Sequence, residues 1–342
     1  MPLHNFAAPR GTRVEFTIDS AAVRNNRLGD PTTRRVAVYL PEAYEDSADD
    51  YPLFVDLVGF TGSGLAHFNW RPFGDNIPQR IDRLIAEGKM GPVVTVFPDC
   101  FTSMGGNQYI NSATMGNWED FLIDEMLPAV EERFRVRRGR EHRALFGKSS
   151  GGYGSIVHGL RRADAWGAVA CHSGDMGFLM CYARSFTNVL DRLAEHERSI
   201  DQLLTHFETK PKLSRADLDV IEILAMAASY DPDPDSKRGI RLPVDLRTGE
   251  MIPDRWANWL AHDPVELAAV PEHLANLRSL KGLYIDCGNH DQYGLVYGAR
   301  ALVTKLETAG IARRYEEFDD DHTGVDYRQD VSFPFLYQAV AG

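Results

Sequence analysis

The stretch RALFGKSSGG, residues 143 to 152, runs from an apolar segment straight into a corner of glycines and serines. It fits the pattern G-x-S-x-G, with Ser149 at its centre. In that pattern a strand turns sharply into a helix, and small neighbours let the two approach while the serine hydroxyl is held out above a sheet. The pattern predicts Ser149 as a nucleophile. A plain glycine-rich turn is the alternative. A Walker-type phosphate loop would need a glycine at position 142, where this sequence has His142.

Apolar runs on both sides of this corner alternate with segments of helical spacing. Nearly continuous apolar runs are typical of parallel strands that are buried on both faces. The alternation predicts an α/β fold, with a mostly parallel central sheet and helices on both faces. The expected strands are 34–41, 51–60, 92–99, 143–146, 166–174, 279–288 and 312–319, and the expected helices between them include 78–91 and 117–134.

The alternation is lost between residues 175 and 278. Residues 188–207 and 215–229 have helical spacing, and 242–253 has the pattern of a hairpin. We expect a helical and hairpin lid inserted over the carboxyl edge of the sheet, where open α/β sheets place their sites. The predicted parts are a core domain, 10–174 and 279–342, and a lid, 175–278.

Composition narrows the class of function. The chain has 342 residues and a net charge of −12, so a nucleic acid would be repelled on average. It has no apolar run of about 18 residues that could span a membrane and no secretory signal pattern at its start. Its four cysteines form no C-x-x-C pair, which favours reduced, buried thiols and a cytoplasmic location. No metal or cofactor is expected.

A serine nucleophile needs an imidazole base, which a carboxylate in turn orients. In this fold the chain order is serine, acid, histidine. Asp291 follows the strand that ends near 288, and His322 follows the last expected strand, so both lie at the edge where Ser149 is expected. The rival groups are His290 and His172 for the base and Asp286 for the acid.

Ester hydrolysis also needs donors for the oxyanion. We expect the backbone N–H of Ser150 and of Phe60, since Phe60 lies in the glycine-rich loop after an early buried strand. A merely flexible turn is the alternative for that loop. The candidate substrate-binding residues are Gly59, Trp70, Gln108 and Trp256. The two tryptophans have an alternative role as ordinary core residues.

Several of these segments together resemble the putative-esterase family of α/β-hydrolases, which includes S-formylglutathione hydrolases, feruloyl esterases and mycolyltransferases. GKSSGGYGS is similar to the family's nucleophile turn, IDCGNHDQY to its acid loop and DDDHTG to its histidine loop. The resemblance covers most of 12–174 and 280–335, and it implies an α/β-hydrolase fold and a triad of Ser149, Asp291 and His322. One departure is Val58-Gly59, where such esterases often have His-Gly.

The resulting hypothesis is a serine carboxylic-ester hydrolase that works through an acyl-enzyme on a small to medium acyl ester. An acyltransferase with the same acyl-enzyme, or a non-catalytic binding protein on a degenerate hydrolase scaffold, is the alternative. The expected partner is a small-molecule ester, and a homodimer is the candidate oligomeric state.

Overall fold

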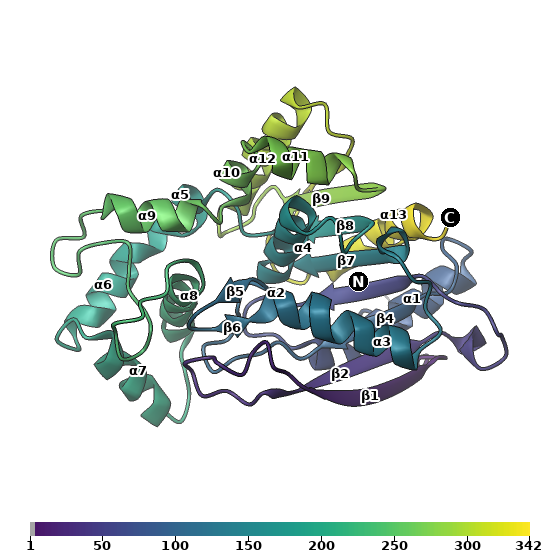
Figure 1. The fold of residues 1–342 in the computed structure, drawn as a ribbon, viewed down its shortest axis with the longest axis horizontal. Coiled ribbons are helices and arrows are strands. Elements are labelled where there is room, and N and C mark those ends of the chain that lie inside the picture. The colour runs from purple at the N-terminus through teal and green to yellow at the C-terminus, as the bar shows by residue number, and fades with distance from the viewer. Residues whose placement is uncertain (1–3) are drawn as a thin grey trace.

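A computed structural model describes residues 4–342. Within these residues, eight strands form one sheet in the order β1-β2-β4-β3-β7-β8-β9-β10 (Figure 1). The pairs β1–β2 and β2–β4 are antiparallel, and every neighbouring pair from β4 to β10 is parallel. This mostly parallel sheet confirms the predicted α/β class.

All seven expected strands are present. The strands of the sheet are β1 Thr12–Asp19, β2 Thr33–Leu40, β3 Leu53–Leu57, β4 Val94–Pro98, β7 Arg143–Lys148, β8 Ala168–His172, β9 Gly282–Gly288 and β10 Arg314–Phe318. The short strands β5 Asn111–Ser112 and β6 Gly116–Asn117 pair with each other. The helices of the first part are α1 Ile77–Ala86, α2 Trp118–Asp120, α3 Leu127–Arg133 and α4 Ser150–Arg161. Those that follow are α5 Phe178–Cys181, α6 Phe186–Ala194, α7 Ile200–Thr209, α8 Arg215–Tyr230, α9 Pro253–Leu260, α10 Pro264–Leu267, α11 Pro271–Arg278, α12 Leu295–Thr308 and α13 Gln329–Val340.

The two faces of the sheet carry separate apolar clusters. Successive side chains of a strand point to opposite faces. Leu145 of β7 packs on the α4 side, whereas Phe146 packs on the side that α1 and α13 cover. On that second side, the Phe146 ring lies 4.8 Å from the ring of Phe333 in α13. Burial on both faces explains why the central strands are almost entirely apolar.

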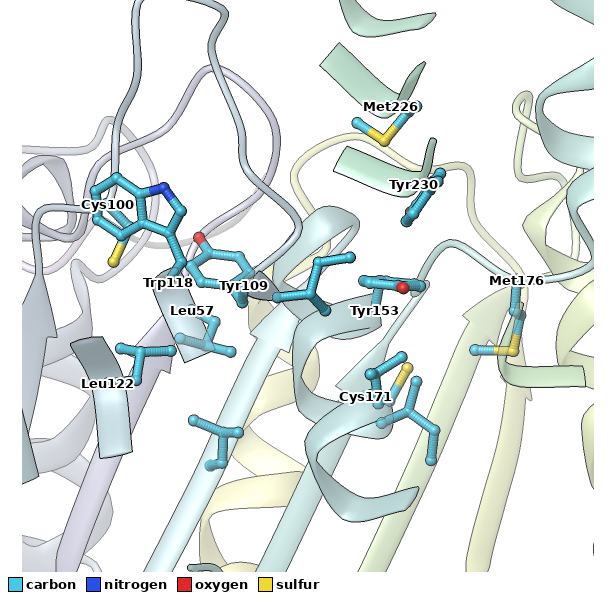
Figure 2. Close-up of a cluster of buried hydrophobic side chains, with 14 of the residues drawn as sticks. Leu57, Cys100, Tyr109, Trp118, Leu122, Tyr153, Cys171, Met176, Met226 and Tyr230 are labelled. Carbon is cyan, nitrogen blue, oxygen red and sulfur yellow. The ribbon is translucent and has the colours of Figure 1, made fainter. Parts of the chain in front are cut away.

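The larger cluster continues from the sheet into the segment that was expected to be a lid. Figure 2 shows Tyr153 of α4 between the sheet residues and Tyr230 of α8. The Tyr153 and Tyr230 rings are 5.7 Å apart, and both side chains are buried. Helices α6 to α9 gather at one end of the molecule in Figure 1. The division of the chain at residues 174 and 279 stays a prediction.

Local structure differs from the sequence-based expectations at several points. The helix expected over 188–207 is two helices, α6 and α7, because the linker between them holds Glu197 and Arg198 at positive φ of 53° and 59°. The helix expected over 117–134 contains a π-helical turn at Phe121–Met126, just before Pro128, which has no N–H to donate. The hairpin expected over 242–253 is reduced to one bridge between Val244 and Met251.

The turn from β7 into α4 leaves no room for a side chain at Gly151. A Cβ there would lie 1.9 Å from the carbonyl oxygen of Leu57 in β3. We expect Gly151→Ala to lower the free energy of unfolding by about 3 kcal/mol, because strand and helix would have to separate. Gly159→Ala in the same helix is the control. Its Cβ would meet side-chain atoms and no backbone, with Leu277 at 3.2 Å, Val169 at 3.3 Å and Leu280 at 3.5 Å, so urea unfolding should show a much smaller change.

Candidate active site

Ser149 lies between the end of β7 and the first residue of α4, and its backbone is strained. Its φ of 57° and ψ of −125° are unusual for a residue with a side chain. The conformation is held from both sides. The Ser149 N–H donates to the carbonyl of His172 at the end of β8 (3.0 Å), and the Tyr153 N–H donates to the Ser149 carbonyl (2.8 Å). The predicted strand-to-helix turn is therefore present.

Asp291 and His322 form a hydrogen-bonded pair. His322 Nδ1 lies 2.8 Å from Asp291 Oδ2, and both side chains are buried. The other carboxylate oxygen of Asp291 accepts from the Tyr293 N–H (3.0 Å), and the His322 N–H donates to Gln292 Oε1 (3.0 Å). These bonds fix both loops, one after β9 and one after β10. Because Nδ1 is engaged, Nε2 is the ring nitrogen of His322 that remains for another partner.

Ser149 and His322 line one cavity of about 640 Å³ at the carboxyl edge of the sheet. Residues of α6 and α8 line the same cavity from the other side. Within residues 4–342, no hydrogen bond joins Ser149 Oγ to His322 Nε2. Such bonds often tighten only when substrate is bound. The structure thus brings Ser149, Asp291 and His322, the three residues singled out from the sequence, to the carboxyl edge of the sheet.

The two predicted oxyanion donors also lie beside Ser149. Phe60 and Gly59 line the cavity, and a Cβ on Gly59 would be only 3.3 Å from the Cβ of Ser149. Ser150 begins α4, so its N–H has no partner inside that helix. The loop that carries Phe60 is held by Tyr109, whose hydroxyl donates to the Val58 carbonyl at 2.6 Å.

Three predicted substrate-binding residues do not line this cavity. Trp70 is 71% exposed and contacts the ring of His4. Trp256 packs against Phe186, with ring centroids 5.9 Å apart. Gln108 is fully buried, and its amide donates to Asp175 (3.0 Å) and to the hydroxyls of Tyr182 and Tyr230. Of the four candidates, the structure places only Gly59 on the cavity.

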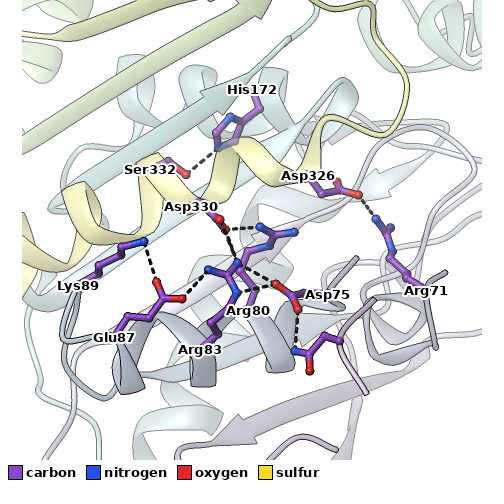
Figure 3. A network of polar contacts seen from close by, with 11 residues as sticks. Arg71, Asp75, Arg80, Arg83, Glu87, Lys89, His172, Asp326, Asp330 and Ser332 are labelled. Carbon is purple, nitrogen blue, oxygen red and sulfur yellow. Dashed lines mark hydrogen bonds and ion pairs between the residues drawn. The ribbon is translucent and has the colours of Figure 1, made fainter. Parts of the chain in front are cut away.

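The rival histidine His172 belongs to a separate buried network on the α13 side of the sheet. Its Nδ1 lies 2.8 Å from Asp286, and its Nε2 lies 2.9 Å from the hydroxyl of Ser332 (Figure 3). Arg328 also donates to Asp286 (3.0 Å). Burial alone raises the pKa of Asp286, but His172 and Arg328 outweigh that effect and hold the pKa below its ordinary value. This network joins α13 to β8 and β9.

The other rival, His290, is exposed and pairs with the exposed Asp319 at 3.0 Å. It does not line the cavity. Neither rival competes geometrically with His322 for Ser149.

The Asp286 network predicts a pH-dependent contribution to stability. A carboxyl whose pKa is lower in the folded state stabilises that state above its ordinary pKa of about 4, and the contribution disappears as the pH falls through the folded value. We expect Asp286→Asn to cost about 3 kcal/mol at pH 7, because it leaves buried partners uncompensated. In urea unfolding, the deficit should be constant from pH 7 to 5 and should shrink below about pH 4. Asp319→Asn, at an exposed pair, is the control; a deficit independent of pH would contradict the prediction.

Several cavity residues were not found from the sequence. Asp175 follows β8 at the same edge, and its carboxylate accepts from Tyr182 (2.9 Å) and lies 3.3 Å from the Ser150 hydroxyl. Glu222 of α8 and Lys148 of β7 also line the cavity. The position of Asp175 just past a strand end was a usable signal. Glu222 offered none, because helical spacing does not show which face meets a distant sheet.

Among residues 4–342, no three His, Cys, Asp or Glu side chains are grouped to hold a metal ion. In the same part of the chain, every helix is too short or too polar to cross a membrane.

A mostly parallel sheet with a serine at the turn after β7, an acid after β9 and a histidine after β10 defines an α/β-hydrolase. The chain belongs to the family described as "Putative esterase", whose model matches residues 27–332. It is 30% identical over 169 residues to an esterase of Mycobacterium tuberculosis, an alignment that covers 46% of this chain and 34% of that protein. The chain thus spans about a third of the length of that curated relative.

Solved structures of esterases share the fold. A ferulic acid esterase superimposes with a TM-score of 0.61 at 21% identity, over 96% of this chain and 98% of that one. An S-formylglutathione hydrolase from Agrobacterium tumefaciens gives a TM-score of 0.59 at 14% identity, over 99% of this chain and all of that one (100%). At these identities the likeness shows the α/β-hydrolase fold.

Proposed function

We propose that this protein is a serine carboxylic-ester hydrolase. The observation that carries the proposal is the strained Ser149 turn, which faces the same cavity as the imidazole of the buried Asp291–His322 pair. A nucleophile, a base and an orienting carboxylate are the groups that acyl transfer through an acyl-enzyme requires. Membership in an esterase family supports the same chemistry.

The reaction follows from these positions. His322 Nε2 removes the proton of Ser149 Oγ as the oxygen attacks the acyl carbonyl, and Asp291 stabilises the resulting imidazolium. The N–H groups of Phe60 and Ser150 donate to the oxyanion. When the ester C–O bond breaks, the imidazolium gives its proton to the departing alcohol. Water, deprotonated by His322, then attacks the acyl-enzyme and releases the acid.

The proposed substrate is a small to medium acyl ester. A cavity of about 640 Å³ lies within the range of small-molecule sites, about 300–1,000 Å³. The rings of Phe60, Tyr182 and Tyr293 line it, so an aromatic acyl group is a suitable candidate. The similarity to a ferulic acid esterase points in the same direction.

The nucleophile is tested by Ser149→Ala. We expect kcat for p-nitrophenyl acetate to fall by at least about 10⁴-fold, because the remaining groups cannot form an acyl-enzyme. Labelling by a fluorophosphonate probe should also be lost, while the thermal midpoint stays close to that of the wild type. Ser155→Ala, a buried hydroxyl further along α4, is the matched control. Retained turnover or labelling in the Ser149 variant would refute the assignment.

The orienting carboxylate is tested by Asp291→Asn. An amide can place the imidazole in the wrong tautomer, so kcat should fall by about 10³- to 10⁴-fold with little change in KM. Steady-state kinetics on p-nitrophenyl acetate measures both constants. Asp319→Asn should leave them unchanged, since that carboxylate pairs only with the exposed His290. A loss of less than tenfold in the Asp291 variant would remove this residue from the proposed triad.

A further inference from the structure

Most charged side chains on the cavity wall have a partner. Arg71 is bonded to Asp326, as Figure 3 shows, and Arg215 is paired with Asp219 at 3.0 Å. The buried carboxylate of Asp56 is bonded to His67. The charged groups of these three pairs already have partners within the protein, so they do not need a charged ligand.

Lys148 is different, because no carboxylate of residues 4–342 lies within ion-pair distance of its ammonium group. It is the last residue of β7, directly before Ser149, and it is half-buried on the cavity wall. Along β7 its side chain lies on the same face as Phe146, the face that α13 covers. Burial, with a smaller effect of the Arg71 guanidinium, lowers the pKa of Lys148 against the opposing charges of Asp291 and Asp321, so the ammonium lies in a partly desolvated place.

An ammonium that is partly removed from water without a partner costs free energy, which an anion bound beside it would offset. A second cation, the exposed Arg184, lines the same cavity and has no ion pair within the described residues. Two cations without an ion pair among the described residues therefore line the cavity that Ser149 also lines.

The carboxyl groups on the opposite wall do not cancel this preference. Burial, with the nearby charges of Asp175 and Asp219, raises the pKa of Glu222 to about 8, so this group is mostly protonated at neutral pH. Asp175 is buried and keeps its charge, but its Oδ2 already accepts from the neutral donors of Gln108 and Tyr182. Glu222 therefore adds little negative charge at neutral pH, and the charge of Asp175 is stabilised by hydrogen bonds within the protein.

We propose that Lys148 binds an anionic group, such as a carboxylate, on the substrate, so that the site prefers esters that carry a negative charge on the acyl or the alcohol part. This inference rests on the proposed esterase function and narrows its substrate class.

Two matched pairs of esters test it. The acyl pair is the mono-p-nitrophenyl ester of adipic acid and the same compound with its free carboxyl methylated. The alcohol pair is 3-acetoxybenzoate and its methyl ester. After correction for spontaneous hydrolysis, the wild type should show about tenfold higher kcat/KM for the charged member of at least one pair. The pair that shows the preference identifies which part of the substrate carries the charge.

Lys148→Met keeps the apolar stem and removes the charge, so the charged-to-neutral ratio of kcat/KM should fall about tenfold. Lys148→Arg should retain part of the preference. Lys281→Met, which removes the same charge from an exposed position outside the cavity, should leave the ratio unchanged. Circular dichroism and thermal midpoints check that each variant is folded.

Turnover of neutral esters without a preference for either charged ester, or a preference that persists in Lys148→Met, would overturn the inference while the esterase function stands. If the wild type hydrolyses none of the four esters and a fluorophosphonate does not label Ser149, the proposed function fails and the inference fails with it.

Discussion

The structure depends on the close approach of β3, β7 and the start of α4 around Ser149. At Gly147 a Cβ would lie 2.4 Å from the Gly151 carbonyl, and at Gly151 it would lie 1.9 Å from the Leu57 carbonyl. The backbones of β3, β7 and α4 are in direct contact here, so the surroundings of Ser149 impose its strained conformation. Loosening this contact would release the strain and let the hydroxyl turn away from the cavity.

The loop beside this turn is steadied in an unexpected way. The sequence has Val58 where similar esterases often have a histidine, which removes one side chain that could fix the loop. The hydroxyl of Tyr109 makes a short bond to the Val58 carbonyl instead, and the Gly62 N–H closes a turn onto the Gly59 carbonyl at 3.0 Å. Tyr109, which is distant in the sequence, thus holds this loop through a backbone carbonyl.

The buried parallel strands could be predicted from the sequence, because burial on both faces favours continuous apolar runs. The Ser149 turn could be predicted because its geometry requires small neighbouring residues. The break between α6 and α7 was not predictable, since Glu197 and Arg198 take left-handed conformations that their residue types do not indicate. Position after a strand end identified the candidate acid and the candidate base. Aromatic character did not identify the residues that line the cavity, because Trp70 lies outside it. The missing partner of Lys148 is a property of three-dimensional placement alone.

The order of elements along the chain also matters for biosynthesis. Ser149 and β8 leave the ribosome well before β9 and β10, and His322 follows β10, the last strand along the described chain. Helix α13 comes later still, and its Ser332 completes the bonding of His172, whose carbonyl holds the Ser149 turn. During translation Ser149 is therefore present before His322, and the proposed nucleophile has no base until β9, β10 and α13 have emerged and folded.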